Sequence, residues 1–78
     1  MTARDAVLAA FRRLESKTGR QAFSPADILA EVRLVGAPFK DSTIRTHVIS
    51  RLCANAPHHH AVVYPDLERV DRGLYQRR

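Results

Sequence analysis

Hydroxyl, imidazole and guanidinium groups recur in one short segment near the middle of the chain. These groups hydrogen-bond phosphate oxygens and the edges of bases, so their density here suggests a surface that binds nucleic acid. The candidate DNA contacts of this segment are Lys40, Ser42, Thr43, Arg45, Thr46, His47, Ser50 and Arg51.

The charge balance supports the same class of partner. The 78 residues include 13 Lys and Arg against 8 Asp and Glu, which gives a formal charge of +5. Eleven of the 13 cations are arginine, the side chain that best forms paired hydrogen bonds to phosphate. A small basic domain predicts nucleic acid as its partner, ahead of an anionic membrane or an acidic protein.

Arg45 has two interpretations. Helical spacing places it next to the apolar row that begins at Ile44, rather than opposite that row. It could bind O6 and N7 of guanine, or it could form an ion pair with Asp27 or Glu31 in the preceding segment. Ser42 and Thr43 likewise could contact DNA or could cap a helix.

Metal binding and catalysis are not expected. His58, His59 and His60 are consecutive, and together with Cys53 they match no zinc-site spacing. Cys53 follows an apolar residue in a helical pattern, which predicts a buried thiol. The sequence shows no nucleophile paired with a base, no glycine-rich phosphate loop and no carboxylate pair for acid–base work. We therefore expect no metal, no cofactor and no enzymatic activity.

Two helices are predicted in the first half of the chain. Thr2 and Asp5 can cap a helix over residues 2–18, and Gly19 can end it. Residues 21–23 could form a brief strand. Ser24 as cap and Pro25 at the first helical position then start a second helix that runs to about residue 34.

A third helix and a hairpin are predicted in the second half. The third helix should begin at residue 41 or 42 and end near Asn55, before Pro57. Residues 67–70 and 74–77 are short strand candidates, joined by the three-residue connection 71–73 with Gly73 in it. Arg72 lies at that turn and is a further candidate DNA contact. The predicted core consists of Val7, Phe11, Leu14, Phe23, Ile28, Leu29, Val32, Ile44, Val48 and Leu52.

This order of elements resembles the winged helix-turn-helix superfamily. Residues 42–47 and 53–57, followed by 66–70 and 73–75, make the chain similar to a family of small bacterial winged-helix domains of unassigned function. The resemblance implies an α+β fold with three helices and a small three-stranded antiparallel sheet, whose β-hairpin is the wing. Through the wider superfamily it implies double-stranded DNA binding, with the third helix in the major groove and Arg72 of the wing on the adjoining backbone.

The size of the chain and its apolar pattern set the remaining expectations. Residues 1–78 suffice for a single winged-helix domain. No apolar run approaches the roughly 20 residues of a membrane span, and no signal peptide is apparent, which favours a cytoplasmic protein. A transcriptional regulator or an accessory DNA-binding protein is expected. A protein-interaction module that binds an acidic partner is the alternative, and a homodimer stays open.

Overall fold

The computed structural model describes residues 2–52 and 66–78. Its elements are α1 (Ala3–Thr18), β1 (Ala22–Phe23), α2 (Pro25–Leu34), α3 (Asp41–Thr46), the π-helical turn η1 (His47–Arg51), β2 (Leu67–Asp71) and β3 (Leu74–Arg77). The predicted α+β class is confirmed: three helices accompany a three-stranded antiparallel sheet with the strand order β1-β3-β2. This architecture is compatible with a winged helix.

The first two helices begin where their capping residues predict. Thr2 and Asp5 form a reciprocal capping box at α1, and Ser24 and Asp27 form another at α2. Gly19 ends α1 with a left-handed φ of 74°. At the end of α2, the backbone N–H of Gly36 donates to the carbonyl of Arg33 at 3.0 Å, so local hydrogen bonds mark all four ends of α1 and α2.

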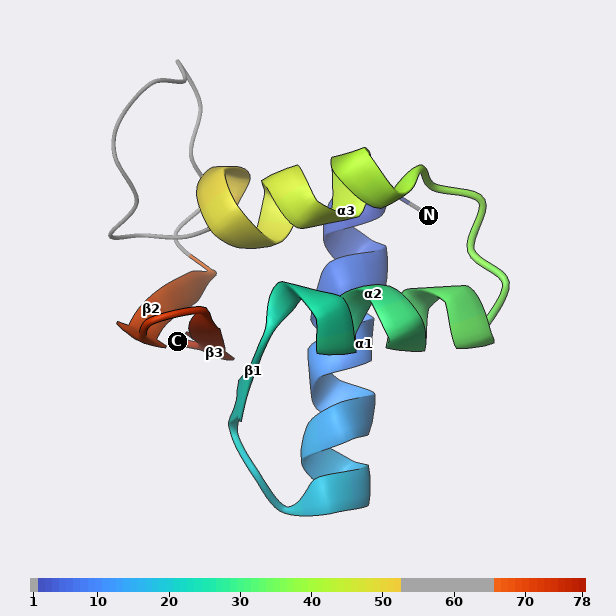
Figure 1. Ribbon diagram of the computed structural model, residues 1–78. Coiled ribbons are helices and arrows are strands. Elements are labelled where there is room, and N and C mark those ends of the chain that lie inside the picture. The colour runs from blue at the N-terminus through green and yellow to red at the C-terminus, as the bar shows by residue number, and fades with distance from the viewer. Residues whose placement is uncertain (1, 53–65) are drawn as a thin grey trace.

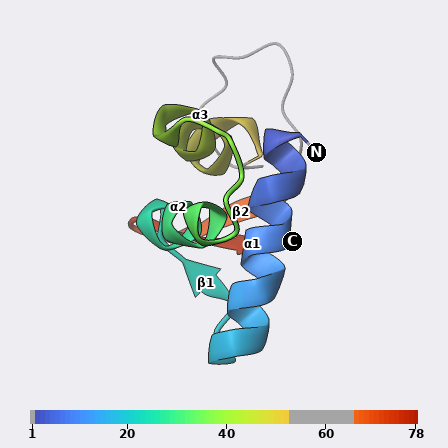
Figure 2. The ribbon, with the colours of Figure 1, turned by 90° about the vertical axis from the view of Figure 1, so that its right-hand side faces the viewer.

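The helices cross rather than run parallel. α1 stands crosswise to α2 and α3, and the sheet lies beside the start of α2 and the end of η1 (Figure 1). Seen from the side, α1 occupies one side of the molecule, while α2 and α3 occupy the other (Figure 2). The upper side of α3 in these two views is not covered by α1, α2 or the sheet.

The core joins all three helices to the sheet. Nine of the ten predicted core residues are buried, and Leu14 is partly buried against the same cluster. Phe11 and Phe23 meet edge to face with their ring centroids 5.9 Å apart, which links α1 to β1. The structure adds Ala3, Ala10, Leu67 and Tyr75 to the predicted cluster.

The third helix differs from the prediction of one α-helix that reaches about Asn55. The α-helix ends at Thr46 and continues as a π-helical turn, in which the backbone N–H of Leu52 donates to the carbonyl of His47 at 2.9 Å. This bond spans five residues in place of the four of an α-helix, which widens the helix there. The predicted last turn at residues 53–55, and Pro57 after it, lie outside the described residues.

The turn of the hairpin is shorter than predicted. β2 extends to Asp71, which pairs with Leu74, so the connection is the two-residue turn of Arg72 and Gly73. The register shifts between Arg69 and Asp71, where an irregularity of the bulge type absorbs one residue. Gly73 has a φ of 70°, the left-handed conformation that this turn requires.

Candidate nucleic-acid interface

The outer surface of α3 is polar. Ser42, Arg45 and Thr46 are exposed, whereas Thr43 and His47 are half-buried. A shallow hollow of about 210 Å³ lies among Ser42, Thr43, Thr46 and His47. Four of the predicted contacts thus line one depression, and Arg45 is not among its lining residues.

The opposite side of the same segment fixes this orientation. Ile44, Val48 and Leu52 are fully buried, as their four-residue spacing predicts. Ile49, in the same segment, is 44% exposed. It belongs to the π-helical turn η1. The apolar row holds α3 on α1 and α2 and leaves the polar residues outside.

Lys40 occupies the N-cap of α3. Its side chain makes no capping hydrogen bond and is exposed. Because the N-cap position is taken by Lys40, the hydroxyls of Ser42 and Thr43 are not the N-caps of this helix. The capping alternative for these two residues therefore does not hold.

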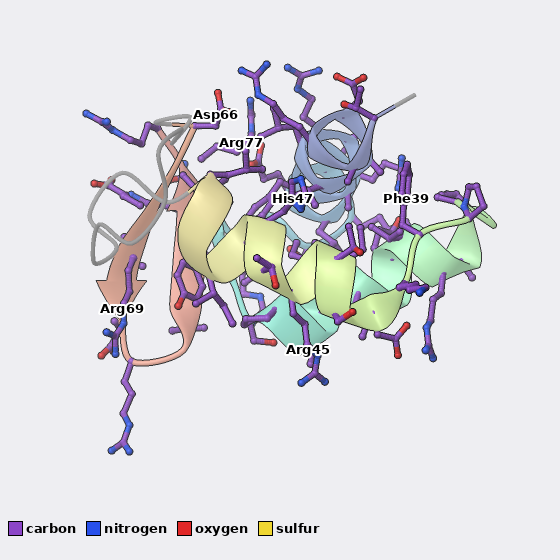
Figure 3. All side chains as sticks on the ribbon, turned by 90° about the horizontal axis from the view of Figure 1, so that it is seen from above. Phe39, Arg45, His47, Asp66, Arg69 and Arg77 are labelled. Carbon is purple, nitrogen blue, oxygen red and sulfur yellow. The ribbon has the colours of Figure 1, made fainter. Side chains whose placement is uncertain are left out.

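Arg45 extends from α3 into solvent. It points away from α1, on the same side of the molecule as the turn of the hairpin (Figure 3). Within the described part of the chain no salt bridge joins it to Asp27 or Glu31. Asp27 is held in the α2 capping box, and Glu31 binds cations from α1. The ion pairs considered for Arg45 are thus absent among these residues.

Arg45 does influence a nearby carboxylate. The hydrogen bonds from Arg33 lower the pKa of Asp41 below its ordinary value, and the charges of Arg33 and Arg45 lower it further. Arg33 and Asp41 form a salt bridge between α2 and the start of α3. Asp41 is therefore neutralised largely by Arg33, and Arg45 keeps its guanidinium group for other partners.

His47 is oriented by the helix itself. Its Nδ1 lies 2.7 Å from the carbonyl oxygen of Thr43, one turn earlier. This bond holds the imidazole ring back along the helix, at the wall of the hollow. In Figure 3 the ring lies on the side of α3 that faces α1, opposite Arg45.

The hairpin supplies a second basic element. Arg72 is exposed at the turn, and its backbone N–H donates to Oδ1 of Asp71 at 2.7 Å. Arg69 lies on the same side of the molecule as Arg45 (Figure 3), and its Nε donates to the carbonyl of Asp71 at 3.4 Å. The turn and α3 thus present arginines toward a common side.

All eight acidic side chains are engaged within the chain. Each accepts at least one hydrogen bond from a side chain or a backbone N–H. Arg77, for example, holds Glu15 and lowers the pKa of that carboxyl. Among the described cations, those in no salt bridge include Lys40 and Arg45 at α3 and Arg72 at the hairpin. Part of the surplus positive charge therefore lies at α3 and at the turn of the hairpin.

Several predicted features fall outside this description. The backbone of Ser50 and Arg51 belongs to η1, but their side chains are not described. Cys53 and His58 to His60 lie outside the described residues. In the part of the chain that is described, no cluster of three metal-binding side chains occurs and no helix is long and apolar enough to cross a membrane.

Sequence reasoning did not anticipate the ion cluster that supports the interface from behind. Glu31 on α2 is buried and accepts hydrogen bonds from Arg13 and Lys17 of α1. Lys17 first, and Arg13 next, lower the pKa of Glu31. The only signal in the sequence is an acidic residue beside the apolar side of α2, which does not identify its partners.

Taken together, the fold and the site define a small α+β domain that presents a polar helix and an arginine-tipped hairpin on one side. The chain belongs to a family described as a domain of unknown function, DUF7669, whose model matches residues 3–77. No curated protein and no solved structure gave a significant match.

Proposed function

We propose that this chain is a winged-helix domain that binds double-stranded DNA. α3 would enter the major groove with Ser42, Thr46 and Arg45, while the hairpin would act as the wing and place Arg72 on the adjoining backbone. The observation that carries the proposal is that every carboxylate is engaged inside the chain, whereas Lys40, Arg45 and Arg72 stand exposed. Phosphate is the partner favoured by such cations, which form no salt bridge with the described residues.

The shape of the surface favours a duplex over a single strand. The surplus cations flank a helix with exposed hydroxyls, which suit base edges and phosphate oxygens. Tyr75, the aromatic residue of the hairpin, is buried and pairs in register with Phe23, so it is not presented for base stacking. A regulator or an accessory of DNA processing, acting in the cytoplasm as a monomer or homodimer, is consistent with this proposal.

A protein-interaction module for an acidic partner is the second candidate. Leu34 is 72% exposed and Val35 is 52% exposed at the end of α2. Leu34 also borders a shallow apolar depression with Ala26, Leu29, Ala30 and Arg33. Exposed apolar side chains beside a basic surface fit a protein partner as well.

Fluorescence anisotropy on a pool of random duplexes tests the first candidate. If Lys40 and Arg72 each neutralise one phosphate, the slope of log affinity against log salt is about −1.8, and additional phosphate contacts would make it steeper. Arg72→Ala should reduce the magnitude of this slope by about 0.9. Absence of binding to any duplex at low salt would refute DNA binding, and binding of an acidic protein surface in its place would favour the second candidate.

Arg45→Ala separates base reading from a structural role. Arg45 is exposed and forms no salt bridge among the described residues, so we expect an unchanged melting temperature. Sequence preference should fall at the base pair that Arg45 contacts, because a good arginine–guanine pair discriminates by about 1–3 kcal/mol. A lower melting temperature with intact preference would assign Arg45 a structural role instead.

A further inference from the structure

The hydrogen bond of His47 determines which ring nitrogen holds the proton. Nδ1 lies 2.7 Å from the carbonyl oxygen of Thr43, and a carbonyl oxygen can only accept. Nδ1 must therefore donate its proton to this bond. In a neutral imidazole with its proton on Nδ1, the other nitrogen, Nε2, can only accept. The helix backbone thus selects the tautomer of His47.

Nε2 differs chemically from the other groups of the same surface. Ser42, Thr43 and Thr46 line the hollow with hydroxyls, which both donate and accept. The guanidinium of Arg45 only donates. Among the described residues, Nε2 of His47 has no hydrogen-bond partner within the chain. His47 therefore offers a fixed acceptor beside groups that donate.

We propose that His47 is a specificity-determining residue of the DNA interface and binds an exocyclic amino group, N6 of adenine or N4 of cytosine, in the major groove. The inference rests on the proposed DNA binding. The major-groove edges of guanine and thymine present only hydrogen-bond acceptors, so either base would leave Nε2 facing an acceptor. Because each base pair has its amino group on one strand, His47 distinguishes the two orientations of a pair.

The restraint on the ring makes this reading selective. A hydroxyl can rotate to suit either a donor or an acceptor, so Ser42 and Thr46 tolerate several bases. The bond to Thr43 holds the His47 ring in place, and Nε2 cannot become a donor while the ring is neutral. Arg45 and His47 would then read opposite kinds of group, on opposite flanks of α3.

Selection from a library of random duplexes tests the proposal in the full chain. The wild-type protein should enrich a motif, and His47→Ala should lose the preference for adenine or cytosine at one base pair while it keeps the rest. Arg72→Ala is the matched control. It should weaken binding to all duplexes alike and should leave the motif unchanged, because its proposed contact is to phosphate.

A base analogue tests the same contact in the unmodified protein. In the selected duplex, the contacted adenine is replaced by purine, which lacks the N6 amino group, or the contacted cytosine by an analogue without N4. Wild-type affinity should fall about five-fold, the value of one neutral hydrogen bond. His47→Ala should bind both duplexes equally. Since the first comparison needs no protein variant, it stands even if His47→Ala folds poorly.

The outcomes separate this inference from the proposed function. An unchanged motif in His47→Ala, or equal wild-type binding to the analogue, would overturn the inference. Uniform weakening of all sequences in His47→Ala would also overturn it, because that result indicates a phosphate contact. Wild-type binding without an enriched motif would remove the base contact and leave DNA binding intact. Failure to bind any duplex would overturn both.

Discussion

Glu31→Gln is the substitution most informative about how the interface is supported. The Glu31 carboxylate is buried and accepts hydrogen bonds from Nζ of Lys17 at 3.0 and 3.2 Å and from Nε of Arg13 at 3.0 Å. These bonds join α1 to α2, on which α3 packs. Glutamine keeps the shape of the side chain and removes its charge, so both cations lose their counter-ion.

The size of the effect follows from the exposure of the three side chains. Breaking a buried ion pair costs about 3–5 kcal/mol, whereas exposed pairs contribute about 0–1 kcal/mol. The side chain of Glu31 is 6% exposed, but those of Arg13 and Lys17 are 35% and 52% exposed and can be rehydrated. We therefore expect a loss of about 2 kcal/mol, which lies between the two limits. For a domain of this size, it lowers the melting temperature by about 8–16 °C.

Thermal unfolding followed by circular dichroism measures this loss. Glu15→Gln is the matched control, because Glu15 and Arg77 are 22% and 37% exposed and their bridge should contribute under about 1 kcal/mol. Since the pKa of Glu31 is lowered in the folded state, its contribution is present above its ordinary pKa of 4.5. This contribution is lost as the pH falls through the folded-state pKa, so the melting temperatures of wild type and Glu31→Gln should converge in acid. Equal melting temperatures for wild type and Glu31→Gln at neutral pH would refute the reasoning.

Three further predictions concern local features. Ser24→Ala removes a capping hydrogen bond of α2 and should cost about 1 kcal/mol in urea unfolding, and an unchanged midpoint would contradict the role of the cap. Gly73→Ala places a side chain at a φ of 70° with open space around it, so strain alone should cost about 1–2 kcal/mol; a neutral result would show that the turn relaxes. Asp41 should titrate below its ordinary pKa in carboxyl-resolved NMR, and Arg33→Gln should raise that pKa toward its ordinary value; no change would exclude the salt bridge in solution.

The local signals of the sequence predicted the framework of this fold well. Ser24, Pro25 and Asp27 define the start of α2 through contacts within four residues, so no tertiary information was needed. Val48 and Leu52 were predicted to be buried because a helix repeats its faces at that spacing. The end of β2 was harder to predict, because the bulge between Arg69 and Asp71 shortens the turn and no residue type in the sequence indicates it.

The candidate site was predicted less completely. Its residues followed from their types, but the environment of Arg45 depends on which carboxylates other cations already hold. Those pairings join residues far apart in the chain, such as Lys17 and Glu31, and periodicity does not reveal them. The π-helical turn that begins at His47 could not be predicted from the sequence either, because a single wider turn depends on tertiary packing rather than on local preference. The sequence therefore predicted where the surface lies better than which of its groups are free to bind.

The backbone hydrogen bond between Leu52, which follows η1, and Leu67, the first residue of β2, has a consequence for how the length of this domain can vary. The N–H of Leu67 donates to the carbonyl of Leu52 at 2.8 Å, and both side chains are fully buried. The two ends of the intervening stretch of chain are thus fastened to each other and to the core. The entropy of closing a flexible loop grows only with the logarithm of its length, so doubling such a loop costs about 0.6 kcal/mol. Insertions between Leu52 and Leu67 could therefore give related domains different lengths here without moving α3 relative to the hairpin.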